Sequence, residues 1–171
     1  MSAEALIQEL EHESATTRRV LERVPGDRLG WKPHPKSMTI GGLAMHIAMT
    51  PAFITGWALQ DSVEAVDGAP PFEPTSTDEI LAAHDKSVMT AMAALTTLGD
   101  AGLEREWRMT SKDGTTLFAW PKAALVRAYA LNHLFHHRGQ LSVYLRLLDV
   151  SVPSIYGPSA DENPMRTTAG V

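Results

Sequence analysis

Four stretches of the chain repeat apolar residues at the spacing of an α-helix. They run from Ala3 to Val24, from about Ile40 to Gln60, from the N-cap candidates Ser76 and Thr77 to Gly99, and from Lys122 to about Asp149. Four amphipathic helices of similar length favour an all-α fold, a four-helix bundle in a single domain over residues 1–171. We expect an ordered core at about 3–150, then a C-terminal loop and tail at 151–171 that frays at its end.

Prolines and glycines interrupt this pattern at three places. Pro51 lies inside the second predicted helix, where it removes a backbone donor and predicts a kink just after His46. Four Pro and Gly residues between Asp67 and Pro74 predict an extended connection across one end of the bundle. The segment from Leu103 to Trp120, centred on SKDG, predicts a short β-hairpin before the last long helix.

The amino-acid composition excludes several classes of protein and argues against others. The 171 residues include no Cys, which excludes zinc fingers, iron–sulfur ligation, thiol nucleophiles and disulfides. A net charge of −5 with no cluster of Lys and Arg argues against nucleic acid as a partner. The most apolar window, 43–59, is short and polar for a membrane span. The first residues are acidic where a secretory signal is basic, so we expect a cytoplasmic protein.

Histidines carry the candidate chemistry. Three of the seven lie between positions 133 and 137. His133 and His137 are four residues apart, so one helix face presents both imidazoles to a single point. The H-E-x-x-H motif of zinc proteases has the same spacing, but here Leu134 replaces its Glu, which removes the general base. His136, three residues from His133, could replace His137 as the partner or flank the site.

A third ligand has to come from another helix. His46 is the best candidate because it lies among apolar residues on a predicted buried face; the alternative is a core histidine bonded to a carbonyl. His84 is a weaker candidate on the third helix, whereas His12 and His34 are expected to be a solvated residue and a loop residue.

Two polar residues continue the stripe of His133 and His137. Gln140 and Tyr144 would lie above a bound metal and could orient a ligand or substrate, although Tyr144 could equally be a core aromatic residue with a satisfied hydroxyl. Arg138 should point away from this face, into a salt bridge or a helix-end contact rather than a catalytic role. Three imidazoles without a carboxylate or thiolate leave open positions on a divalent ion, as in catalytic sites. Because imidazole suits zinc, nickel, copper and iron, the residue types do not identify the metal.

Three segments resemble one protein family. TIGGLAMHIAMTP, NHLFHHRGQLSVYLRLL and VPSIYGPSADE are similar to segments of the DinB/YfiT-like superfamily of metalloenzymes, and H-x-x-x-H-R-G-Q is the most specific element. The resemblance implies a four-helix bundle with one long crossover and a metal held by His46, His133 and His137. It also implies an activity related to thiol-dependent S-transferases and isomerases, and a dimer.

These observations favour a metal-dependent enzyme, a transferase or a hydrolase. Its metal would activate a low-molecular-weight thiol or water against a small electrophilic substrate. Two alternatives remain: a non-catalytic bundle that binds a ligand or partner and has only a vestigial metal site, and a structural role in which the histidines only form hydrogen bonds. We also expect a homodimer, because the fourth helix has a second apolar face. That face comprises Leu131, Leu134, Leu141, Leu145 and Leu148.

Overall fold

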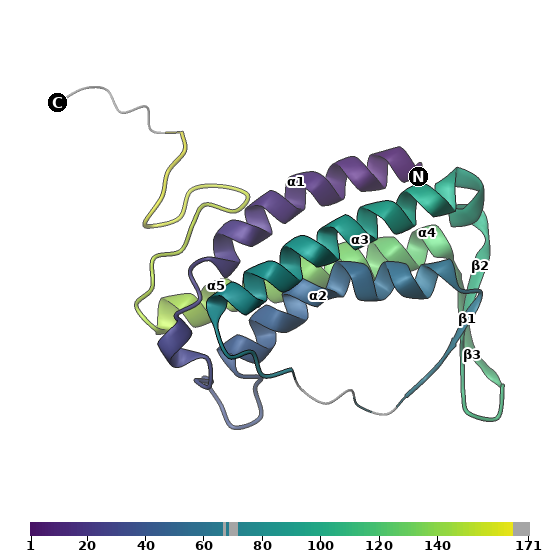
Figure 1. The fold of residues 1–171 in the computed structure, drawn as a ribbon. Coiled ribbons are helices and arrows are strands. Elements are labelled where there is room, and N and C mark those ends of the chain that lie inside the picture. The colour runs from purple at the N-terminus through teal and green to yellow at the C-terminus, as the bar shows by residue number, and fades with distance from the viewer. Residues whose placement is uncertain (67, 69–71, 166–171) are drawn as a thin grey trace.

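The computed structural model describes residues 1–66, 68 and 72–165 and shows a bundle of long helices with a small sheet at one end (Figure 1). The helices are α1 (Ala3–Leu21), α2 (Ile40–Leu59), α3 (Thr77–Glu104) and a final helical run, with a short 3-10 turn at Gly26–Arg28. The final run consists of α4 (Lys122–Leu125), the π-helical segment η2 (Val126–Asn132) and α5 (His133–Leu147). The predicted helical bundle is confirmed.

The sheet contains the predicted hairpin and one strand that the pattern did not reveal. Strands β2 (Glu106–Thr110) and β3 (Thr116–Pro121) pair antiparallel, and the three-residue strand β1 (Ser62–Glu64) adds to β2 in parallel. Because β1 follows α2 and β2 follows α3, this pairing joins the ends of two helices that are far apart in the sequence.

One predicted helix end was wrong. α1 ends at Leu21 rather than Val24, because the chain turns there through hydrogen bonds from Arg23 and Val24 back to Val20 and Leu21, ahead of Pro25. The predicted helix end at Gly99 coincides with a kink in α3, where φ of 56° and ψ of −176° are not helical. A second helical segment follows the kink and ends at Glu104.

Proline at position 51 does not end α2. The helix continues to Leu59 and bends along its length (Figure 1), as an internal proline predicts. The Thr50 hydroxyl donates a hydrogen bond of 2.6 Å to the carbonyl of His46 near the bend. The predicted connection at 67–74 and the predicted fraying of the tail fall partly outside the described residues, which exclude 67, 69–71 and 166–171.

Two groups of buried side chains form the core. One joins the end of α1 and the first half of α2 to α5, and the other joins the start of α1, the end of α2, α3 and β2 to the final helical run. Leu131 belongs to the second group and Leu134 to the first. His133, between them in sequence, therefore lies where the two groups meet.

The apolar character of α2 is explained by its place in the bundle. By length and composition alone α2 could cross a membrane, but 61% of its most apolar window is buried inside the fold. It packs against α3, α5 and η2. A core position is thus the simpler interpretation, in line with the prediction that α2 is not a membrane span.

The second apolar face of the last helix does not support a dimer. Four of its five leucines are at most 1% exposed within a single chain, and Leu148 packs against the same core. The argument from this face was therefore wrong, because α1, α2 and α3 already cover it. The homodimer stays a prediction that rests on the family resemblance alone.

Candidate metal centre

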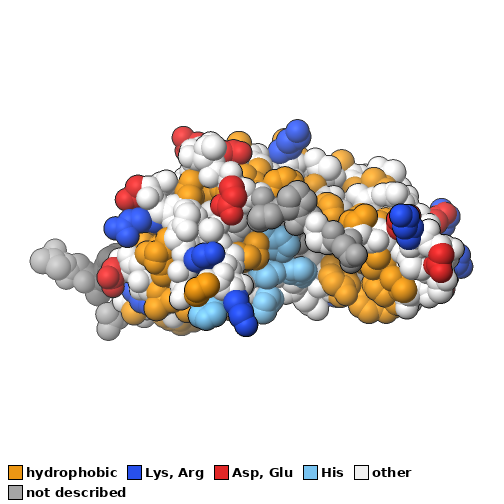
Figure 2. Space-filling model, turned by 90° about the horizontal axis from the view of Figure 1, so that it is seen from below, with side chains coloured by type: hydrophobic (Ala, Val, Ile, Leu, Met, Phe, Trp, Pro, Cys, Tyr) orange, Lys and Arg blue, Asp and Glu red, His pale blue; other side chains and the backbone are white. Residues whose placement is uncertain are grey.

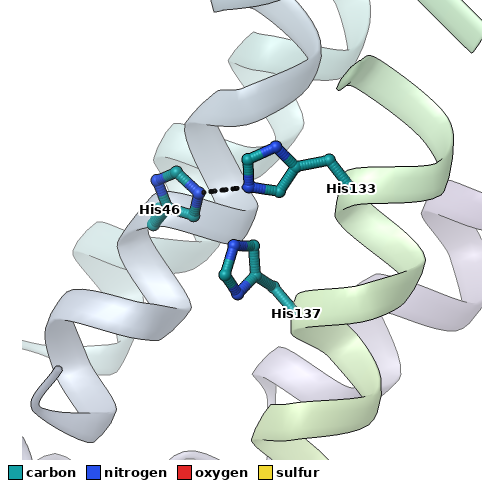
Figure 3. A group of neighbouring side chains, drawn as sticks. All are labelled: His46, His133 and His137. Atoms are coloured by element: carbon teal, nitrogen blue, oxygen red, sulfur yellow. Dashed lines mark hydrogen bonds between the residues drawn. The ribbon is translucent and has the colours of Figure 1, made fainter. Parts of the chain in front are cut away.

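Three histidines from two distant segments meet between α2 and α5. His46 projects from α2, while His133 and His137 project from successive turns of α5 (Figure 3). One ring nitrogen of each lies within 4.8 Å of one ring nitrogen of the others. The pairwise distances between ring centroids are 5.1, 4.7 and 4.5 Å. The structure thus brings together the same three residues that the sequence predicted.

The separation of the ring nitrogens is close to what one ion requires. Nε2 of His46 and Nε2 of His133 are 3.1 Å apart. Two nitrogens that each lie about 2.0–2.1 Å from a tetrahedral zinc ion are about 3.3 Å from one another. His46 and His133 therefore already have nearly the separation that one ion requires, and the third ligand atom, from His137, lies within 4.8 Å of both.

Local backbone structure sets the direction of these imidazoles. The spacing of four residues places His133 and His137 one above the other on α5. The π-helical segment η2 ends at Asn132, immediately before His133. A π-helical turn contains an extra residue relative to an α-helical turn, so it shifts which side chains face α2 from that point onward. η2 therefore contributes to the register that aims His133 at His46.

Gln140 fixes the orientation of His137. Its side-chain oxygen lies 2.9 Å from Nδ1 of His137, and its amide nitrogen lies 3.4 Å from the hydroxyl of Tyr144. An amide oxygen only accepts hydrogen bonds, so Nδ1 of His137 carries the proton and Nε2 keeps its lone pair. Metal-binding histidines usually have such a partner on their second nitrogen. The structure thus gives Gln140 a contact with His137, and its predicted role in orienting a bound ligand or substrate stays a prediction.

Tyr144 lies further from the cluster and is 4% exposed. Its ring packs edge-on against Trp31, with the centroids 5.7 Å apart. The alternative prediction, a core aromatic residue whose hydroxyl is satisfied, describes Tyr144 well. Its hydroxyl contacts Gln140, which in turn contacts His137.

All three imidazoles are weakly basic in this environment. Burial, reinforced by the proximity of His137 and His46, lowers the pKa of His133 to about 4. Burial first, and then His137, lowers the pKa of His46. Burial also lowers the pKa of His137, partly offset by the hydrogen bond to Gln140. The three rings are consequently neutral at pH 7, the protonation state in which a histidine binds a metal.

The other candidate histidines lie outside the cluster. The His136 ring is 4.8 Å from that of His137, but it is not part of the convergent group, so it flanks the site rather than replacing His137. His84 is 2% exposed and contacts Asp85 through Nδ1, and its Nε2 has no partner among the described residues. His34 is an exposed loop residue, as predicted.

Arg138 forms the predicted salt bridge, although in the interior rather than on the surface. It pairs with Glu13 of α1 at 2.6 Å, and their side chains are only 1% and 8% exposed. The guanidinium also bonds to Thr17 and lies over the rings of Phe135 and Tyr156. It holds α5 against α1 and has no contact with the cluster.

A cavity beside the cluster was not predicted from the sequence. It has a volume of about 310 Å³, and His46 and His133 form part of its wall. The rest of the wall comes from α2, β2, β3, α4 and η2. Helical periodicity finds the buried face of each helix but not the space that remains where helices and strands meet.

Known proteins with similar sequences and folds were found by comparison. The family model described as "DinB family" matches residues 1–166. The Bacillus subtilis proteins YrdA and YjoA, both described as uncharacterized, are 26% and 31% identical over 156 and 134 residues. These alignments cover 89% of this chain and 86% of YrdA, and 76% of this chain and 80% of YjoA.

Two crystal structures share the fold. A DinB-like protein from Bacillus cereus has a TM-score of 0.70 and 24% identity, covering 91% of this chain and 98% of its own. The structure of B. subtilis YjoA, also described as DinB-like, has a TM-score of 0.68 and 22% identity, covering 88% and 96%. At this identity the likeness establishes the bundle architecture alone.

Proposed function

Because the chain belongs to the DinB family and its fold brings three neutral imidazoles to one point, we propose that it is a divalent-metal-dependent enzyme. His46, His133 and His137 would hold the ion. The observation that carries this proposal is their convergence from two separate helices without any carboxylate or thiolate in the group. All three side chains are half-buried with lowered pKa values, and such clusters of titratable groups are often functional sites.

The donor set fits a catalytic rather than a structural ion. Structural zinc sites are usually closed by four protein ligands, whereas three-histidine sites keep a position for a reactant. A divalent ion bound there would lower the pKa of a bound water or thiol and so favour the nucleophilic form at neutral pH. The protein's part is to hold three lone pairs in place, through packing for His46 and His133 and through Gln140 for His137.

Between the two nucleophiles, the side chains favour a thiol. Activation of water in many metal sites is assisted by a nearby carboxylate as general base, and no carboxylate belongs to this group within the described part of the chain. A thiol is far more acidic than water and needs less assistance. The proposed reaction is therefore the transfer of a low-molecular-weight thiol to a small electrophile, with hydrolysis as the other outcome of the test.

Turnover assays with defined metal content test this function. Metal-free protein, prepared with a chelator, is reloaded with Zn²⁺, Ni²⁺ or Fe²⁺ and offered several low-molecular-weight thiols with a chromogenic electrophile. We expect thiol-dependent turnover with at least one metal, and none after chelation. If all combinations remain at the uncatalysed rate while the metal is bound, the chain is a non-catalytic metal-binding bundle and the enzymatic proposal fails.

Gln140→Leu should weaken metal binding without removing a ligand. The variant leaves Nδ1 of His137 without its acceptor, so the ring can rotate and its preferred proton position is lost. Loss of such a partner typically costs about 10–100-fold in metal affinity. Competition with a chromophoric chelator measures the change. Tyr144→Phe is the matched control, because it removes only the 3.4 Å contact to Gln140 and should change the affinity by less than about threefold.

A further inference from the structure

The cavity next to the histidine cluster has a definite position relative to the metal ligands. Its volume of about 310 Å³ is at the lower end of the ~300–1,000 Å³ typical of small-molecule sites. His46 and His133 line it, but His137 does not. An occupant of this cavity would consequently reach the ion from the edge formed by His46 and His133.

Aromatic rings make up most of the rest of the wall. They belong to Phe53, Trp57, Trp107, Phe118 and Tyr129. The indoles of Trp57 and Trp107 stack with their centroids 5.8 Å apart, and Phe118 lies 5.9 Å from Trp107. These contacts hold the rings in fixed positions. Figure 2 shows the histidine side chains directly beside hydrophobic ones on the side toward the sheet.

Charge is missing from this wall. Among the described residues that line the cavity there is no Asp, Glu, Lys or Arg. The hydroxyl of Thr50 is already engaged with the carbonyl of His46. An ion moved into such surroundings would lose its hydration without gaining a partner. An uncharged apolar ring would gain contact with aromatic faces.

The polar end of the cavity lies at the histidines. The Tyr129 ring stacks on Trp120 and lies 6.3 Å from the ring of His133, centroid to centroid. Its hydroxyl forms no hydrogen bond with the described residues. A ligand with one polar end would thus place that end near Tyr129, His46 and His133 and its apolar end among the aromatic rings.

We propose that this cavity selects an uncharged aromatic substrate, with the ring packed against the aromatic side chains of Phe53, Trp57 and Phe118 and the electrophilic end held against His46 and His133. The inference rests on the proposed function, since it names the substrate class of the same site. A bound divalent ion would itself attract an anion, so the preference for an uncharged ring belongs to the aromatic part of the cavity and is measured on the metal-free chain. The cavity itself would bind a neutral aromatic molecule whether or not a metal is present.

Calorimetric titration with a matched pair of probes tests the inference. Metal-free protein is titrated with indole, which is neutral, and with indole-3-carboxylate, which has the same ring and a negative charge. We expect indole to bind at submillimolar concentration and the carboxylate to bind at least tenfold more weakly. Equal binding of the two probes, or no binding of indole, overturns the inference.

A cavity-filling variant locates the binding site. Met109 of β2 pairs with Phe118 of β3, and both line the cavity, so Met109→Trp should fill it and abolish indole binding. Leu117 precedes Phe118 on the strand, points to the opposite face and is 54% exposed. Leu117→Trp therefore adds the same ring outside the cavity and should bind indole as the unmodified chain does. Unchanged indole binding by Met109→Trp would overturn the inference.

Two further measurements separate this inference from the metal proposal. His137→Ala removes a proposed ligand that is not in the cavity wall, so it should lose metal and keep indole binding. Met109→Trp should lose indole and keep metal. Retention of metal by His137→Ala would contradict the metal site while leaving the cavity standing. A cooperative urea unfolding transition would show that the Met109→Trp variant is folded. If that variant does not fold, Phe118→Trp, which also adds volume to the cavity wall, replaces it in the experiment.

Discussion

Replacing His133 with alanine should reduce the bound metal from one ion per chain to nearly none. The change removes one of three ligands, and Nε2 of His133 is the atom 3.1 Å from Nε2 of His46. Even the loss of a hydrogen-bond partner to a ligand costs about 10–100-fold in metal affinity, so the loss of the ligand itself should cost more than ~100-fold. Elemental analysis of protein purified without a histidine tag measures the stoichiometry.

His136→Ala is the matched control for this experiment. It removes an imidazole from the same helix, one residue from His137 and outside the convergent group. The control should retain one ion per chain. Retention of one ion by His133→Ala would refute the ligand assignment, and loss of the ion from His136→Ala would place His136 in the coordination sphere.

Metal-dependent stability gives an independent measurement of the same prediction. A ligand that binds only the folded state at 100 times its Kd raises the free energy of unfolding by about 2.7 kcal/mol. Added Zn²⁺ should therefore shift the urea midpoint of the unmodified chain and of His136→Ala. Added Zn²⁺ should leave the urea midpoint of His133→Ala unchanged, because this variant has no metal site that could stabilise the folded state.

Local sequence patterns were enough to find the helices and two of the three clustered histidines. His133 and His137 are one turn apart on a single helix, so their convergence follows from helical geometry. His46 required the further argument that a histidine on an apolar helix face needs a partner. The structure supplies that partner across the contact between α2 and α5.

Features that depend on pairing between distant segments could not be predicted. β1 is three residues long and exists because β2 offers it a parallel partner, which no local pattern encodes. η2 has the same apolar spacing as its neighbours, so the extra residue in its turn is visible only in the backbone. The cavity depends on the relative placement of helices and strands.

The leucines of the last helix were interpreted incorrectly from the sequence. Their number suggested a second apolar face for a partner subunit, but each is covered inside one chain. A helix that is apolar around most of its circumference is typical of a central position in a bundle, and it does not by itself indicate an interface.

The largest loss of stability should come from Arg138→Met. The change leaves the carboxylate of Glu13, 8% exposed, without its cationic partner in the interior. Removal of one member of a buried ion pair typically costs about 3–5 kcal/mol. Urea denaturation at pH 7 measures this loss, which is a large share of the ~5–15 kcal/mol that stabilises a typical domain. The hydroxyl of Tyr156, 3.1 Å from the carboxylate, compensates only in part.

Two controls show whether burial of the pair is the cause. Arg108→Met breaks an ion pair with Glu106 in which both side chains are more than half exposed, so it should cost at most about 1 kcal/mol. Arg138→Met combined with Glu13→Met replaces both charges with apolar groups and should recover most of the lost stability, because no unpaired charge remains. A cost below about 1 kcal/mol for Arg138→Met alone would mean that the carboxylate is solvated. In that case the pair would not be what holds α1 against α5.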